Sequence, residues 1–141
     1  MADLADLPRG TVTFLFTDVE GSTRLWEAHP DGMRAALVEH DALIEFLTAQ
    51  HGGHVVRPRG EGDSRFCVFR RATDAVAAAA AIQRALHAEA WPPEAPLRVR
   101  LALHTGEADL RVTTRSPSAI WSSTVIWKSG SAARMPARNA L

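Results

Sequence analysis

The sequence predicts an α+β domain with a ferredoxin-like split βαβ arrangement, in which an antiparallel sheet carries helices on one face and the elements follow the order β-α-α-β-β-α-β. Two stretches, 11–17 and 97–105, alternate apolar and polar residues as half-buried strands do. An alanine-rich stretch at 72–90 has helical spacing, and a glycine-rich acidic turn at 60–64 joins two short β-like runs. Beyond residue 111 this pattern fails, so we expect the C-terminal part of the fold to be incomplete.

The first half of the chain predicts one strand followed by two helices. The alternation in Thr11–Thr17 places three apolar side chains on one face of a strand, namely Val12, Phe14 and Phe16. Ser22 or Thr23 is the expected N-cap of a short helix. Pro30 begins a longer helix, which the glycine pair at 52–53 ends, because glycine tolerates the left-handed conformation beyond a helix C-terminus.

The second half predicts a hairpin, a helix and a final strand. His54–Arg59 and Arg65–Arg70 are the two hairpin strands. Ala72–Ala90 is a helix that the proline pair after it stops. Leu97–Thr105 alternates again, and we expect Gly106 to close that strand.

Composition limits the classes of protein to consider. With 46% hydrophobic residues in 141, the chain can form the core of one domain and is not globally disordered. No stretch approaches the ~20 apolar residues of a membrane-spanning helix, so no membrane association is expected. The single cysteine, Cys67, allows no intrachain disulfide, and the first ten residues lack the basic and apolar regions of a signal peptide. We therefore expect a cytoplasmic protein.

Charge divides the chain at residue 111. Residues 1–111 contain 12 arginines and 16 acids, hence 12 − 16 = −4, whereas residues 112–141 contain four cations and no acid, hence +4. We expect one domain over residues 10–111 and a basic, Ser/Thr-rich tail over 112–141, in which Ala119–Trp127 is a weaker strand candidate. The tail is either the product of a truncation or reading-frame change or a genuine appendage. Four cations without interleaved aromatic residues do not favour nucleic acid as a partner.

Two acidic turns are the candidate chemical site. Asp18 follows the first predicted strand, and Asp63 lies in the hairpin turn. In a split βαβ fold the first strand lies beside the hairpin, so the two carboxylates can meet, and paired carboxylates suit Mg²⁺ or Mn²⁺. The amides of the following Gly-Ser-Thr at a helix N-terminus could bind an anion. The alternative is that each aspartate only shapes its turn, and spacing alone does not decide between the two.

Three stretches resemble class III adenylate/guanylate (nucleotidyl) cyclase catalytic domains. FLFTDVEGSTRLWE, residues 14–27, is similar to the metal-binding opening of that family. VVRPRGEGDSRFCVF, residues 55–69, resembles its second motif, which contains Gly-Asp before an alternating strand. LRVRLALHTGEA, residues 97–108, resembles the next strand, which ends in His-x-Gly. The motifs occur in the family's order within residues 10–111, so the resemblance covers the metal-binding half of such a domain.

The resemblance implies a set of site residues and a reaction. Asp18 and Asp63 would be the carboxylate ligands of two Mg²⁺ or Mn²⁺ ions, and the carbonyl of Val19 a further ligand. Backbone amides would bind the β- and γ-phosphates, those of Glu20, Gly21, Ser22 and Thr23. The ribose 3′-hydroxyl would then attack the α-phosphate, which converts ATP to 3′,5′-cyclic AMP and pyrophosphate.

Arg59 occupies the position at which the family reads the purine, where lysine is usual for adenine and glutamate for guanine. Arginine can donate to adenine N1, but it is not interchangeable with lysine. Arg59 could instead face solvent or pair with Glu61. The resemblance thus favours ATP, with GTP as the alternative.

The family's second half has no counterpart in residues 112–141. The family carries Asn-x-(Ala/Ser)-x-Arg on a later helix, which orients the ribose and stabilises charge on the phosphate. Asn139 is the only asparagine here, and no arginine follows it. Since family sites combine two subunits, we expect a homodimer or a heterodimer with a full-length cyclase, and weak or absent activity for this chain alone. The alternative function is a non-catalytic, nucleotide-binding or dimerising regulatory module.

Overall fold

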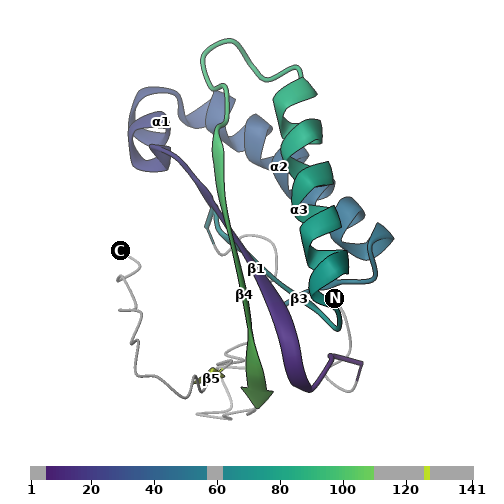
Figure 1. The fold of residues 1–141 in the computed structure, drawn as a ribbon. Coiled ribbons are helices and arrows are strands. Elements are labelled where there is room, and N and C mark those ends of the chain that lie inside the picture. Colours follow the sequence, from purple (N-terminus) through teal and green to yellow (C-terminus); the bar gives the residue numbers. More distant parts are fainter. Residues whose placement is uncertain (1–5, 57–61, 110–125, 128–141) are drawn as a thin grey trace.

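The structure is a computed structural model that describes residues 6–56, 62–109 and 126–127 (Figure 1). The predicted element order is confirmed, and one short strand follows it. The elements in chain order are β1 (Gly10–Val19), α1 (Ser22–Ala28), α2 (Pro30–Gln50), β2 (His54–Val55), β3 (Arg65–Phe69), α3 (Ala72–Ala88), β4 (Val99–Asp109) and β5 (Ile126–Trp127).

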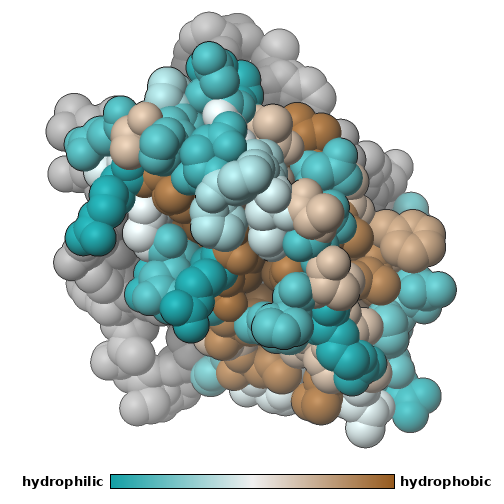
Figure 2. Space-filling model, turned by 90° about the horizontal axis from the view of Figure 1, so that it is seen from above, coloured by the Kyte–Doolittle hydropathy of each residue, from teal (hydrophilic) through white to brown (hydrophobic). Residues whose placement is uncertain are grey.

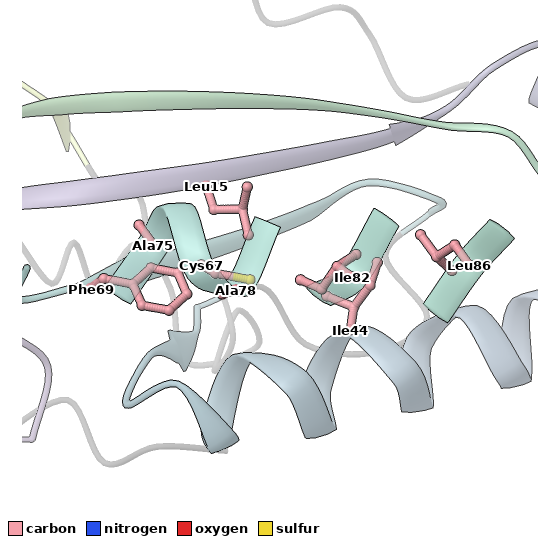
Figure 3. Packing of buried hydrophobic residues seen from close by; sticks show 8 residues of the cluster. All are labelled: Leu15, Ile44, Cys67, Phe69, Ala75, Ala78, Ile82 and Leu86. Carbon is pink, nitrogen blue, oxygen red and sulfur yellow. The ribbon is translucent and has the colours of Figure 1, made fainter. Parts of the chain in front are cut away.

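The strands form one antiparallel sheet in the order β2-β3-β1-β4-β5. β1 is the central strand: all ten of its residues pair with β4, and five of them also pair with β3. The helices α2 and α3 pack together against one face of this sheet (Figures 1 and 3). The predicted α+β class, with an antiparallel sheet and helices on one face, is confirmed.

The main core lies between the two long helices and the sheet (Figure 3). Its fully buried members come from β1, β3, α2 and α3: Leu15, Ile44, Cys67, Phe69, Ala75, Ala78, Ile82 and Leu86. The small alanines of α3 let that helix approach the strands closely. Close approach also explains Gly53, where an added Cβ would lie 2.4 Å from the Phe69 ring. Glycine at this position lets the connection from α2 to β2 pass directly over that ring.

The opposite face of the sheet carries a smaller apolar cluster. Leu7, Val12, Phe14 and Val68 are buried there, and Phe16 packs against them. Val12, Phe14 and Phe16 therefore share one face of β1, as the alternation predicted, whereas Leu15 points to the helices (Figure 3). The Phe66 ring lies 5.0 Å from that of Phe14 and 4.7 Å from that of Phe16, in the range for favourable aromatic pairs.

Several predicted boundaries were wrong. Gly106 does not close the last predicted strand, because it pairs with Val12, the ladder with β1 continues to Ala108, and the strand ends at Asp109. The Ser22/Thr23 cap is replaced by Gly21, which has a φ of 67° and makes no side-chain cap hydrogen bond. Helix α3 ends at Ala88, two residues before the predicted end. Of the first predicted hairpin strand, His54–Arg59, His54 and Val55 form strand pairs, and residues 57–59 lie outside the described residues.

Part of the tail lies outside the described residues. Of the candidate strand Ala119–Trp127, the structure describes Ile126 and Trp127, which pair with Asp109 and Ala108 of β4. The division of the chain at residue 111 stays a prediction. In the described part of the chain, no helix combines the length and apolar character needed to cross a lipid bilayer.

We predict that stability falls steeply at alkaline pH because of Cys67. Burial raises the pKa of this thiol from 9.0 to about 11, although Thr48 donates a hydrogen bond to its sulfur at 3.5 Å. The unfolded thiol ionises first, so the full stability is present below about pH 9 and is lost as pH rises toward 11, by about 3 kcal/mol at most. The chain has no tyrosine and a single lysine, so few other groups titrate in this range.

Urea unfolding of wild type and C67A between pH 7 and 11 measures this contribution. We expect C67A to be less stable at pH 7, since it leaves a small cavity, but to lose less stability as pH rises. Parallel curves for the two proteins would contradict the prediction.

Candidate functional site

The two predicted carboxylates lie at the same end of the sheet. The pairing of β1 with β3 reaches Thr17, which is opposite Arg65. Asp18 is the next residue along β1, and Asp63 lies two residues before Arg65 on the chain that enters β3. Antiparallel register thus brings both acidic segments to the end of the sheet where β1 leads into α1 (Figure 1). Seen from this end, hydrophilic side chains border apolar ones on the molecular surface (Figure 2).

Asp63 has an oxygen that fits a cation ligand. Its Oδ2 is buried and has no hydrogen-bond partner within the described residues. Leaving a carboxylate oxygen unpartnered in a dry environment is costly, and a cation bound to it would remove that cost. Carboxylate oxygens are also the ligands that Mg²⁺ and Mn²⁺ prefer. Asp63 therefore fits the predicted metal site. No group of three or more possible His, Cys, Asp or Glu ligands gathers in the part of the chain that the structure describes.

Asp18 is engaged with an arginine that sequence reasoning missed. Arg100 is its directly paired residue on β4, and Arg100 Nη2 forms an ion pair with Asp18 Oδ2. The Arg100 side chain is about two-thirds exposed and that of Asp18 about half, which leaves the pair open to solvent and to exchange. The two residues are 82 apart in sequence, so only the β1–β4 register reveals the contact. A cation that binds Asp18 must compete with this guanidinium.

The predicted phosphate-binding segment divides into two parts. The Glu20 amide donates to the carbonyl of Arg98 at 2.8 Å and so extends the β1–β4 ladder by one residue. Gly21 then adopts a left-handed conformation, and α1 begins at Ser22. The first amides of a helix have no acceptor within it, which leaves those of Ser22 and Thr23 available to an anion.

Of the two remaining predicted site residues, the structure describes Val19 but not Arg59. Val19 ends β1, and its side chain is buried in a cluster with Met33, Ala36, Ala95 and Leu97. The role of its carbonyl stays a prediction. Arg59 lies outside the described residues, as does Glu61, so the purine-reading position also stays a prediction.

An antiparallel α+β domain with two carboxylates, an arginine and free helix amides at one end of its sheet is suited to phosphoryl or nucleotidyl transfer. The chain belongs to the adenylate and guanylate cyclase catalytic domain family, whose sequence model matches residues 5–137.

Proteins of similar sequence align with parts of this chain. An uncharacterised protein of Mycobacterium tuberculosis is 43% identical over 104 residues, which are 74% of this chain and 34% of that protein. The adenylate cyclase of the yeast Lachancea kluyveri is 37% identical over 87 residues, 62% of this chain and 5% of that enzyme. The chain thus spans about a third of the length of the mycobacterial relative.

Solved cyclase structures share the fold. An adenylate cyclase of Trypanosoma brucei, in its monomeric state, matches with a TM-score of 0.66 and 29% identity over 77% of this chain and 62% of that one. The guanylate cyclase domain of RhGC from Catenaria anguillulae, in complex with GTP, matches with a TM-score of 0.66 and 18% identity over 76% of this chain and 62% of that one. At that identity, the second likeness concerns the fold alone.

We predict that Arg100→Met tightens Mn²⁺ binding in the absence of nucleotide. The variant removes the cation that competes for Asp18. An exposed ion pair is worth about 0–1 kcal/mol, so the gain in affinity is at most about fivefold. Arg98→Met is the matched control, because Arg98 lies on the same part of the chain and pairs at 3.9 Å with Glu20 rather than with Asp18. Equal Mn²⁺ affinities of R100M and R98M by calorimetry would refute the competition.

Proposed function

We propose that this chain supplies the metal-binding part of a nucleotidyl cyclase site, which converts ATP to 3′,5′-cyclic AMP and pyrophosphate. The observation that carries this proposal is the register at the end of β1, which brings the Asp18 and Asp63 segments together. The buried, unpartnered Oδ2 of Asp63 supports it, as does membership of the cyclase family. In this proposal residues 10–111 are the cyclase part, and residues 112–141 are a basic tail.

Asp18, Asp63 and the Val19 carbonyl would hold two Mg²⁺ or Mn²⁺ ions. When bound, these cations would supply the positive charge that eases proton loss from the ribose 3′-hydroxyl and offsets the charge of the triphosphate. The amides of Gly21, Ser22 and Thr23 would donate to phosphate oxygens at the start of α1. The Glu20 amide would join them only by giving up its bond to the Arg98 carbonyl.

Arg100 has a second role in this proposal. Once Asp18 turns to a cation, the Arg100 guanidinium loses its partner at the same end of the sheet. A guanidinium donates to phosphate oxygens in a bidentate manner, so the freed side chain can bind the triphosphate. The ion pair would thus hold Arg100 near the site until substrate and metal arrive.

For the purine we propose adenine, with guanine as the alternative. Arg59 carries only hydrogen-bond donors, and adenine N1 is an acceptor, whereas guanine N1 carries a hydrogen. A direct comparison of ATP and GTP binding to the wild-type chain decides between them.

The remaining catalytic groups would come from a second subunit. Residues 112–141 contain no Asn-x-(Ala/Ser)-x-Arg segment. A homodimer would contain two metal sites without the groups that complete them, whereas a heterodimer with a full-length cyclase would contain one complete site. The same observation favours the second candidate function, a regulatory module that binds nucleotide without turnover.

We predict that the purified chain alone makes little or no cyclic AMP from Mg²⁺- or Mn²⁺-ATP. A missing arginine at a phosphoryl transition state costs about 10³-fold or more in related chemistry. The measurement is cyclic AMP formation by wild type against an Asp18→Ala control. Formation clearly above that control would show that the chain completes its own site.

We further predict that activity returns on mixing with a full-length family cyclase whose own metal aspartates are replaced by alanine. This chain would then supply the carboxylates, and the partner would supply the Asn and Arg groups. Asp63→Ala in this chain should abolish the rescue. Nucleotide binding without rescue at any mixing ratio would instead favour the regulatory module.

A further inference from the structure

A buried arginine lies two residues after the candidate metal ligand Asp63. Arg65, the first residue of β3, is 1% exposed and is among the largest fully buried side chains described. Its charge is balanced by Asp41 of α2, because Arg65 Nη2 forms an ion pair with Asp41 Oδ2. The other Asp41 oxygen lies 2.9 Å from Nδ1 of the buried His40. A helix residue thus anchors the guanidinium from the side of the core.

The rest of Arg65 contacts the two segments that carry the candidate metal ligands. Its Nη1 donates to the carbonyls of Gly62 at 3.2 Å and Ser64 at 2.9 Å, which are the residues on either side of Asp63. Its backbone amide donates to Thr17 Oγ1 at 3.1 Å, and Thr17 precedes Asp18 on β1. One residue therefore ties α2, the Asp63 turn and the end of β1 together.

We propose that the Asp41–Arg65 pair is a positioning device that fixes the turn around Asp63, so that its carboxylate is held where a divalent cation can bind. This inference rests on the proposed function, because it concerns the same metal site. Gly62 supports it: its φ of 90° is a conformation that favours glycine, and the wide conformational freedom of a glycine leaves contacts from outside the turn to fix it.

Core stability alone does not account for this pair. A buried ion pair is a weak means of stabilising a core, and apolar side chains of similar volume often replace one without loss. Lysine could neutralise Asp41 as well as arginine does, but its donors share one nitrogen, whereas arginine uses Nη2 for Asp41 and Nη1 for the two carbonyls. Groups that orient a metal ligand are typically worth about 10–100-fold in metal affinity.

The test compares four forms of the full chain: wild type, Arg65→Lys, the double variant Asp41→Leu/Arg65→Met, and Ile82→Val. The double variant removes both charges and so avoids leaving one buried without its partner. Ile82→Val is the control for a small loss of core packing, since Ile82 lies on α3 in the main core. Cooperative thermal unfolding verifies that each variant is folded, and R65K replaces the double variant if that one fails to fold.

Two measurements are made without substrate turnover: amide hydrogen exchange over residues 62–65, and Mn²⁺ affinity by calorimetry with Asp63→Ala as the reference for loss. We expect the double variant to exchange its amide hydrogens faster in this turn and to bind Mn²⁺ about 10–100-fold more weakly than wild type. R65K should lie between the double variant and wild type in both measurements. I82V should match wild type in both. Unchanged exchange overturns the proposal, and so does faster exchange with wild-type Mn²⁺ affinity. If wild type and D63A both fail to bind Mn²⁺, the proposed function itself is contradicted, together with the metal role of this pair.

Discussion

The pairing of β1 with two neighbours at once is the constraint on which the rest of the structure depends. β1 pairs along its whole length with β4 and over five residues with β3, so both neighbours are fixed in register by one strand. Register with β3 brings the Asp63 turn to the end of β1 that carries Asp18. Register with β4 places Arg100 opposite Asp18. A shift by one residue would move every β1 side chain to the other face and separate all three groups.

The two faces of β1 have different roles, because one packs against the helices and the other carries the Asp18 carboxylate. Leu15 and Val19 point into the clusters formed with the helices, which hold the strand in place. Asp18 lies between Thr17 and Val19, so its side chain points to the other face together with those of Phe14 and Phe16. The core thus positions the carboxylate without enclosing it. Buried neighbours make the backbone rigid, while the functional group remains about half exposed to solvent.

How much the sequence predicts follows from the range of the interactions involved. The alternation of 11–17 and the alanine-rich helix are local patterns, and both are confirmed. Asp18 and Asp63 could be assigned to one end of the sheet because hairpin strands neighbour the first strand in this fold. From the sequence alone, Arg65 and Arg100 look like ordinary solvent-facing charged residues of a strand. Their partners, Asp41 and Asp18, lie on distant elements, so tertiary register alone reveals the contacts.

Boundaries differed from prediction for the same reason. Gly106 is a local signal for a strand end, yet the residues of β1 continue to Gly10 and supply partners as far as Ala108 of β4, and Asp109 pairs with Ile126 of β5. A glycine weakens a strand by its entropy, but several ladder hydrogen bonds on either side outweigh that cost. At the start of α1, a glycine takes the position that was predicted for a serine or threonine cap. Ser22 could cap the helix, but Gly21 reaches the left-handed conformation without a steric penalty and takes the position before it.

The charges at the end of β1 differ in how they are balanced, and this difference bears on the order of events at the site. Asp18 already has Arg100 as a counter-ion, whereas Asp63 Oδ2 has no partner among the described residues. Two carboxylates and one guanidinium leave the site with a net negative charge, which attracts a cation and repels a triphosphate. In the proposed function, a divalent cation would reverse that sign and would also offer Asp18 an alternative to Arg100. In the proposed function, cation binding at Asp63 would therefore favour the later binding of an anionic nucleotide, and the nucleotide would in turn favour the release of Arg100 from Asp18.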